Sequence, residues 1–322
     1  MTRFGYTMMT EQSRPDRLVA DVVAAEAAGF DFSVCSDHFQ PWLAEQGHAG
    51  YAWAILGAAA QATERIGLMT YVTCPTMRYH PAIVAQKAAT LGILSGNRFR
   101  LGLGSGENLN EHVVGERWPA VGVRLEMLVE AVQIIARLLD GVQSVNHRGA
   151  HFDVEQAKLW DLPTERIPIG IAVSGEQSCR LAGRHGDLMI AVEPNAALGE
   201  MFDAAGGAGK PRVGQLALSY DADRETAVRR AHEQFRWFGL GWKVNADLPN
   251  PESFDAATAF VEPRQVGEAL SCGPDVEEHV EAIRRFVDAG FTEVALVQIG
   301  GAHQEPFLRW AEAELLPALR SL

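Results

Sequence analysis

The sequence from Ile66 to Leu103, IGLMTYVTCPTMRYHPAIVAQKAATLGILSGNRFRLGL, contains the repeating unit that decides the fold. Ile66–Val72 and Phe99–Leu103 are short, mostly apolar runs, as expected for strands that are buried on both faces. Between them, Pro81–Leu94 starts with a proline and is predicted to form a helix. A strand, a helix and a second strand in this order favour a parallel sheet.

The same alternation of strand and helix runs through the whole chain. The predicted strands are Phe4–Met8, Phe32–Ser36, Ile66–Val72, Phe99–Leu103, Ile167–Val173, Leu188–Val192, Val213–Tyr220 and Glu293–Ile299. The predicted helices are Arg14–Ala28, Tyr51–Thr63, Pro81–Leu94, Val123–Leu139, Gln177–Gly183, Asp223–Trp237, Val276–Ala289 and Pro306–Leu319. Eight strands, each followed by helix, predict a (β/α)8 TIM barrel, with a doubly wound open sheet as the alternative.

Two stretches interrupt the alternation and are predicted to be insertions. Residues 140–166 contain glycines and polar residues typical of a hairpin or loop, and residues 239–262 are rich in proline, asparagine and tryptophan. The small residues of 203–210 predict a mobile loop. A (β/α)8 barrel needs about 250 residues. The 322 residues therefore fit one barrel domain, 1–322, that includes both insertions.

The composition is that of a globular protein and argues against several classes of function. Apolar residues make up 47 % of the chain and charged residues 21 %. The net charge of −13 argues against binding to nucleic acid or to an anionic membrane, because both require a basic face. We expect a cytoplasmic protein, since there is no membrane-spanning apolar stretch and no signal-peptide layout. The four cysteines are far apart, which predicts reduced thiols and no metal site.

Polar residues follow several predicted strands, at the end where a barrel carries its active site. After the second strand come Asp37 and His38, whose side chains should point to opposite sides of an extended chain and serve different partners. Histidine is suited to proton transfer near neutral pH, although structural hydrogen bonds would explain the pair equally well. Trp42 follows in the same loop and could form the wall of a pocket, whereas Trp237 and Trp242 are assigned to the core.

The loops after the fourth and fifth strands contain the other candidates. Glu107 follows closely spaced glycines, which let another group approach the backbone, although a carboxylate stabilised by a helix dipole is the alternative. This run is not G-x-G-x-x-G followed by a helix, so it is a weak dinucleotide signal. The amides of Ser174–Ser178 could bind a phosphate at a helix start, but an ordinary loop with a serine cap is the favoured reading from position alone.

Three stretches resemble those of a known family. They are Ser36–Trp42 (SDHFQPW), Pro75–Pro81 (PTMRYHP) with Gln86 after it, and Gly104–Glu111 (GSGENLNE). The chain resembles the luciferase-like family of flavin and deazaflavin oxidoreductases along its whole length. Within that family it is most similar to the coenzyme F420-dependent glucose-6-phosphate dehydrogenases. The resemblance implies a (β/α)8 barrel and a homodimer.

The resemblance also implies roles for residues at the mouth of the barrel. His38 would take the proton from a substrate hydroxyl as hydride leaves its carbon, Glu107 would be the partner acid or base, and Trp42 would wall the substrate pocket. The peptide between Tyr71 and Val72 would be a non-proline cis bond or a bulge that supports the cofactor ring. The residues implied to contact the cofactor are Asp37, Tyr71, Val72, Cys74, Ser105, Gly106, Asn110, Ser174, Gly175, Gln177 and Ser178. Cys74 replaces the family's threonine, which puts one hydroxyl contact in question.

Most residues of the family's phosphate site are replaced. Where the sugar-phosphate dehydrogenases have a threonine, two lysines and an arginine, this chain has Val192, Asn195, Lys243 and Ala269. A single lysine lacks the charge-assisted contacts that a dianionic phosphate needs. We therefore expect a less charged, more apolar substrate in a pocket lined by Val192, Trp42 and the 239–262 insertion.

The expected function is hydride transfer between coenzyme F420 and an alcohol or carbonyl substrate. The alternatives are an F420-dependent sugar-phosphate dehydrogenase and an FMN-dependent luciferase-like monooxygenase. An inactive barrel is disfavoured because Asp37, His38, Trp42 and Glu107 are all present. A metal-dependent hydrolase is disfavoured because the histidines are dispersed. The absence of a nucleotide-binding glycine motif argues against NAD(P).

Overall fold

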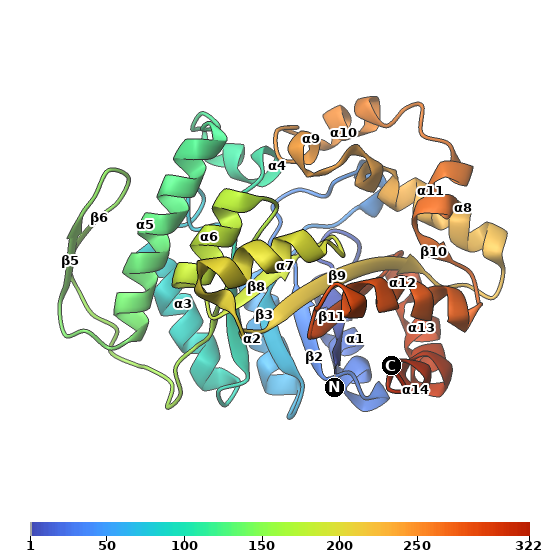
Figure 1. Ribbon diagram of the computed structural model, residues 1–322, viewed down its shortest axis with the longest axis horizontal. Coiled ribbons are helices and arrows are strands. Elements are labelled where there is room, and N and C mark those ends of the chain that lie inside the picture. The colour runs from blue at the N-terminus through green and yellow to red at the C-terminus, as the bar shows by residue number, and fades with distance from the viewer. Residues whose placement is uncertain (1) are drawn as a thin grey trace.

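The computed structural model describes residues 2–322 and contains a closed barrel of parallel strands surrounded by helices (Figure 1). The strands of the barrel are β1 (Arg3–Met8), β2 (Phe32–Cys35), β3 (Gly67–Thr70), β4 (Phe99–Leu103), β7 (Ile169–Ala172), β8 (Leu188–Ala191), β9 (Arg212–Ser219) and β11 (Glu293–Gln298). β11 pairs with β1, and β9 pairs with both β8 and β11, which closes the barrel. The two-residue strand β10 (Ser271–Cys272) pairs with the end of β9. The predicted (β/α)8 barrel is confirmed, and the open sheet is wrong.

The predicted helices are present, with ends that differ slightly from the prediction. They are α1 (Pro15–Ala28), α2 (Ala52–Ala62), α3 (Pro81–Leu94), α5 (Val121–Leu139), α6 (Glu176–His185), α8 (Arg224–Phe235), α12 (Val276–Asp288), α13 (Gln304–Trp310) and α14 (Leu316–Leu319). Gly29 ends α1 in the left-handed conformation, with φ of 96°, which glycine adopts without strain. The side chain of Asp223 caps α8 by accepting from the amide of Thr226.

Both predicted insertions are present, and each has secondary structure of its own. The first contains the hairpin β5 (Val145–Arg148) and β6 (Asp153–Ala157), which projects from the barrel in Figure 1. The second contains a 3-10 turn, Arg236–Leu240, followed by α9 (Trp242–Asn245) and α10 (Pro251–Ala257). α11 (Pro263–Ala269) leads from this insertion to β10.

The predicted loop at 203–210 is wrong for most of its length. α7 (Ala196–Phe202) continues into a π-helical turn, Asp203–Gly207. This turn packs so closely on α6 that a Cβ at Gly183 would lie 2.7 Å from the Cβ of Ala205. The small residues of this segment therefore serve close helix packing, although the same composition also favours a loop.

Apolar side chains fill the interior of the barrel, so the site can lie only at its mouth. One buried cluster consists of Phe32, Val34, Met69, Leu188, Ile190, Val213 and Ala295. The partly buried side chains of Tyr71, Val72 and Ala172 pack on this cluster. These three residues lie at or just beyond the carboxyl ends of β3 and β7, and they form an apolar floor at that end of the barrel.

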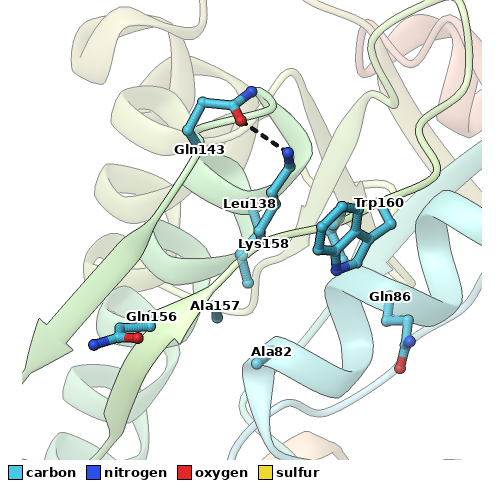
Figure 2. Close-up of a pocket in the computed structure, with 9 residues that line it drawn as sticks. Ala82, Gln86, Leu138, Gln143, Gln156, Ala157, Lys158 and Trp160 are labelled. Atoms are coloured by element: carbon cyan, nitrogen blue, oxygen red, sulfur yellow. Dashed lines mark hydrogen bonds between the residues drawn. The ribbon is translucent and has the colours of Figure 1, made fainter.

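A surface hollow of about 540 Å³ lies between the β5–β6 hairpin and α3 (Figure 2). Its lining residues are Ala82, Gln86, Leu138, Gln143, Gln156, Ala157, Lys158, Leu159 and Trp160. Lys158 Nζ donates to Gln143 Oε1 at 2.8 Å across one side of it. The hollow includes none of the residues predicted to form the active site.

Three further features bear on the sequence predictions. No helix within residues 2–322 is both long and apolar enough to cross a membrane. The four cysteines are all buried and free of disulfide bonds. In this same part of the chain, no group of three or more histidine, cysteine, aspartate or glutamate side chains is arranged to hold a metal ion.

Gly102 on β4 provides a test of how closely β3 and β4 pack. A Cβ atom at Gly102 would lie 2.0 Å from the carbonyl oxygen of Thr70. We expect Gly102→Ala to lower the free energy of unfolding by about 1–3 kcal/mol, as for other overpacked cores. Gly122→Ala in α5 is the control, because its Cβ would meet nothing within 4 Å. It should raise stability by about 0.4–1 kcal/mol. Urea denaturation measures both, and equal stability of the two variants would contradict this packing.

Candidate active site

His38 lies between two carboxylates that come from the loops after β1 and β4. Its Nδ1 lies 3.4 Å from Glu11 Oε1, and its Nε2 lies 3.4 Å from Glu107 Oε2. The side chains of His38, Glu11 and Glu107 are 10 %, 2 % and 16 % exposed. The three side chains are therefore largely shielded from solvent, and a small molecule could contact them only at His38 and Glu107. The folding of the barrel thus brings three strand ends together around one imidazole.

The surroundings of the imidazole indicate which ring nitrogen carries a proton in neutral His38. Nδ1 faces two acceptors, the carbonyl oxygen of Gln40 at 3.2 Å and the carboxylate of Glu11, so it is the donor. Nε2 is then left as the acceptor and faces Glu107. Burial raises the pKa of Glu107, although His38 and a hydrogen bond from Asn110 act to lower it. The site therefore places an imidazole nitrogen that can accept a proton next to a carboxyl group whose pKa is raised by burial.

Aromatic side chains from the second insertion and from the turn that leads into it complete one wall beside His38. The Trp42 ring lies 4.9 Å from the His38 ring and stacks on Trp237 with a centroid distance of 4.1 Å and an interplanar angle of 12°. Phe254 of α10 packs edge-on against Trp42 at 5.1 Å. Trp237 is buried, as expected, but it lies in direct contact with the predicted pocket wall. The insertion therefore contributes to the site.

Asp37 and His38 have different partners, as predicted, and the Asp37 side chain is hydrogen-bonded within the protein. This side chain has no exposed surface. Its carboxylate accepts from Thr73 Oγ1 at 2.7 Å, Tyr79 Oη at 3.0 Å, Trp53 Nε1 at 3.2 Å and Arg78 at 3.3 Å. These four protein donors connect the carboxylate to the surrounding loops.

The Asn110 side chain is also engaged within the protein, and it is 4 % exposed. Its Oδ1 accepts from the amides of Phe39 and Gln40, and its Nδ2 donates to Glu107 Oε2 at 3.1 Å. Asn110 belongs to the short helix α4 (Asn108–Glu111), and Glu107 immediately precedes that helix. The Asn110 side chain therefore links the His38 loop to Glu107.

The backbone around Tyr71 and Val72 has the form that the resemblance implied. The Tyr71–Val72 peptide is cis. Both side chains are partly buried and belong to the apolar floor at this end of the barrel. Gly104 makes room for this arrangement, because a Cβ there would lie 2.6 Å from Val72 Cγ2. Cys74 is buried, and Ser105 is half-buried beside Gly106, whose φ of 91° suits glycine.

The start of α6 offers free backbone donors next to this floor. Ser174 and Gln177 are exposed, and Gly175 has open space around its Cα. Ser178 Oγ accepts from the amides of Ser174 and Gly175, so this hydroxyl is already used within the loop. The first helical amides, at Glu176 and Gln177, have no acceptor among the described residues, as is normal for a helix start. An apolar floor with such donors beside it fits a planar ring that bears a phosphate.

The residues at the predicted phosphate positions do not form a cationic cluster. Val192 is 40 % exposed just after β8. Asn195 caps α7 by accepting from the amide of Ala197 at 3.0 Å, and Lys243 is exposed on α9. Ala269 is exposed at the end of α11. Three buried arginines near this end of the barrel already pair with carboxylates: Arg78 with Asp37 and Glu111, Arg230 with Asp221, and Arg236 with Glu45 and Asp255.

Sequence reasoning missed Glu11, Arg78 and the contact made by Trp237. A signal existed for Glu11, because it follows the first predicted strand just as Asp37 and His38 follow the second. Arg78 lies within a stretch that resembles the family but had no assigned role. No local pattern connects Trp237 with Trp42.

Known proteins are similar to this chain over most of its length. The sequence model of the luciferase-like monooxygenase family matches residues 1–293. The F420-dependent glucose-6-phosphate dehydrogenase of Microbacterium testaceum is 35 % identical over 332 residues, which cover 99 % of this chain and 97 % of that protein. The F420-dependent hydroxymycolic acid dehydrogenase of Mycobacterium tuberculosis is 37 % identical over 291 residues, which cover 89 % of this chain and 80 % of that protein.

A solved structure provides a match over the whole barrel. The F420-dependent secondary alcohol dehydrogenase in complex with an F420–acetone adduct superimposes with a TM-score of 0.89 at 30 % identity and covers 99 % of both chains. The family match, the full-length relatives and the shared barrel lead to one conclusion. The chain belongs to the luciferase-like monooxygenase family.

Proposed function

We propose that the protein is a coenzyme F420-dependent oxidoreductase that interconverts a secondary alcohol and the corresponding carbonyl compound. The observation that carries the proposal is the placement of His38 between Glu11 and Glu107, against Trp42, at the mouth of the barrel. Relatives that are named as F420-dependent glucose-6-phosphate, hydroxymycolic acid and secondary alcohol dehydrogenases support it. When bound, F420 supplies the hydride acceptor or donor.

The proton of the alcohol is handled by His38. In the oxidation direction, Nε2 accepts the hydroxyl proton while the carbinol carbon loses hydride. Glu11 and the Gln40 carbonyl face Nδ1 and keep the ring oriented, and Glu11 stabilises the imidazolium that forms. Glu107, on the opposite side, holds or releases a second proton near the cofactor.

The residues that would hold F420 are divided between two surfaces. Tyr71, Val72 and the backbone of Ser105 and Gly106 would support the ring, together with Cys74, which is buried two residues after Val72. Ser174, Gly175 and Gln177, with the first amides of α6, would bind the phosphate. Ser178 would shape that loop through its own hydrogen bonds.

The substrate is proposed to be an uncharged, largely apolar alcohol or ketone. Trp42, backed by Trp237, offers an aromatic wall, and Val192 places an apolar side chain on the rim. Asn195 is used as a helix cap, and Lys243 is a single exposed cation. Such a pocket favours burial of apolar surface over binding of a phosphate.

Two other functions remain as candidates. Sugar-phosphate oxidation is favoured by the full-length relatives named as glucose-6-phosphate dehydrogenases. An FMN-dependent monooxygenase is favoured by the description of the family. Anaerobic fluorescence titration of the pure protein with F420, FMN and NADPH separates these cofactors. We expect saturable binding of F420 alone, and binding of FMN without F420 would refute the proposal.

Glu107 is expected to give the reaction a pH dependence. Burial raises the pKa of this carboxyl group, so it keeps its proton at pH values at which an exposed glutamate is ionised. If the protonated form is the active one, kcat falls as the pH rises through the raised pKa. Glu107→Gln cannot titrate, so its kcat–pH profile should lack this limb. If kcat of Glu107→Gln still falls with rising pH as in the wild type, the titrating group is a residue other than Glu107.

The protein is further proposed to act in the cytoplasm as a homodimer of chains that each fold as one domain, 1–322. The pairing of β1 with β11 joins the two ends of the sequence in one sheet, which supports a single domain. The apolar side chains of Ile83, Ile93 and Leu94 are exposed on α3, which supports an interface there. Light scattering tests the homodimer, and a monomeric mass would refute it. A single unfolding transition is expected for one domain.

A further inference from the structure

The loop that carries His38 is held in place by a side chain from the loop after β3. Residues 36–40 follow β2 and form neither helix nor strand. The Arg78 guanidinium donates to the carbonyl oxygen of Asp37 at 2.6 Å and to its carboxylate at 3.3 Å. The residue immediately before His38 is thus bound through both its backbone and its side chain.

The other side of the loop is bound by α4. Asn110 Oδ1 accepts from the amide of Phe39 at 2.8 Å and from that of Gln40 at 3.2 Å. The same side chain donates through Nδ2 to Glu107. Asn110 therefore holds the backbone after His38 and the carboxylate that faces His38.

Arg78 is itself bound to the last residue of α4. Its amide donates to Glu111 Oε2 at 2.9 Å, and its Nε lies 3.5 Å from Glu111 Oε1. The Glu111 side chain has no exposed surface, and that of Arg78 is 9 % exposed. Loss of either partner would leave a buried charge uncompensated, which is costly. The guanidinium is therefore confined between Glu111 on one side and Asp37 on the other.

We propose that Arg78 is a positioning residue. Its guanidinium links the carbonyl oxygen of Asp37 to the carboxylate of Glu111, and this link fixes His38 relative to Glu107. The role of His38 in this inference rests on the proposed function, whereas the contacts themselves require no ligand. The planar guanidinium fork reaches both partners at once, and a lysine ammonium at this position could satisfy only one of them well. A misplacement of about 1 Å can cost on the order of 10²-fold in rate.

The first test is made on the protein without any ligand. Arg78→Lys and Arg78→Gln are compared with Arg98→Lys. Arg98 is also partly buried and also donates to backbone carbonyls, those of Ala60 and Ile66, but at the opposite end of the barrel. In ¹⁵N-histidine-labelled protein, the ring-nitrogen signals of His38 should shift or broaden in both Arg78 variants and not in Arg98→Lys. The spectrum of His38→Gln identifies these signals.

The second test separates positioning from binding, at a pH above the value of about 7 to which burial raises the pKa of Glu111. With F420 and an alcohol substrate, kcat should fall by about 10²-fold in Arg78→Gln and by less in Arg78→Lys, with KM and the Kd of F420 near wild type. Arg98→Lys should lower only Tm. Wild-type His38 signals and kcat in the Arg78 variants would overturn the inference.

A variant that fails to fold does not block the test. If Arg78→Gln is unstable, Arg78→Lys and Glu111→Gln provide the same comparison, because each weakens one side of the same link. If the wild type does not bind F420, the proposed function fails, but the ligand-free spectra still decide whether Arg78 positions His38.

Discussion

His38→Ala is expected to lower kcat by about 10²–10⁴-fold, the usual cost of losing a general base. Histidine is the side chain best suited to proton transfer near neutral pH, and the Nε2 atom of His38 lies 3.4 Å from Glu107 Oε2. The Kd of F420 should change little, because the residues proposed to hold the cofactor come from β3, β4 and the start of α6.

Steady-state kinetics measure kcat, and a fluorescence titration measures the Kd of F420. His185→Ala is the control, since this histidine is exposed at the end of α6 and belongs to no part of the site. More than half of the wild-type kcat in His38→Ala would assign His38 a structural role only. A large rise in the Kd of F420 with an unchanged kcat would place the residue in the cofactor site.

Glucose 6-phosphate is expected to be a poor substrate compared with an uncharged secondary alcohol. Each charge-assisted contact that is missing from the phosphate site is worth about 1.5–3 kcal/mol. Three of the four positions, Val192, Asn195 and Ala269, lack the family's phosphate-binding side chain. At about 1.4 kcal/mol per tenfold change, their loss removes several powers of ten in affinity.

The test compares kcat/KM for glucose 6-phosphate, for glucose and for apolar secondary alcohols. A matched variant carries Val192→Thr, Asn195→Lys and Ala269→Arg, and it should gain activity on the phosphate ester and lose it on the apolar alcohol. A strong preference of the wild-type protein for the phosphate ester would contradict the account. In that case Lys243, together with cations contributed by other loops, would have to bind the phosphate.

Most of the fold is predictable because each barrel strand and its helix have a local signal. Ile66–Val72 is recognisable from its apolar run, and Pro81–Leu94 from the proline at its start. Because strands and helices alternate along the chain, few topologies are possible. The failure at Asp203–Gly207 has a tertiary cause. The small residues there allow close packing on Gly183 of α6, a contact that composition alone cannot distinguish from a loop.

The site is only partly predictable for the same reason. His38, Trp42 and Glu107 follow from their places near strand ends, and the structure brings them together. The role of Asp37 depends on four donors from other loops, and the stacking of Trp237 on Trp42 joins residues that are distant in sequence. The resemblance assigned Asp37 and Asn110 to the cofactor, and this stays a prediction, whereas the hydrogen bonds of both side chains to other loops have no local sequence signal.

Hydride transfer between an alcohol carbon and F420 can be followed with an isotope label. The most direct measurement uses 2-propanol that is deuterated at the carbinol carbon, oxidised F420 and the pure protein, followed by mass spectrometry of the reduced cofactor. The account predicts that one deuterium appears in the deazaflavin of the wild-type reaction and that acetone forms in equal amount. Reduced F420 without deuterium, or turnover of the alcohol with FMN and oxygen in place of F420, would contradict it.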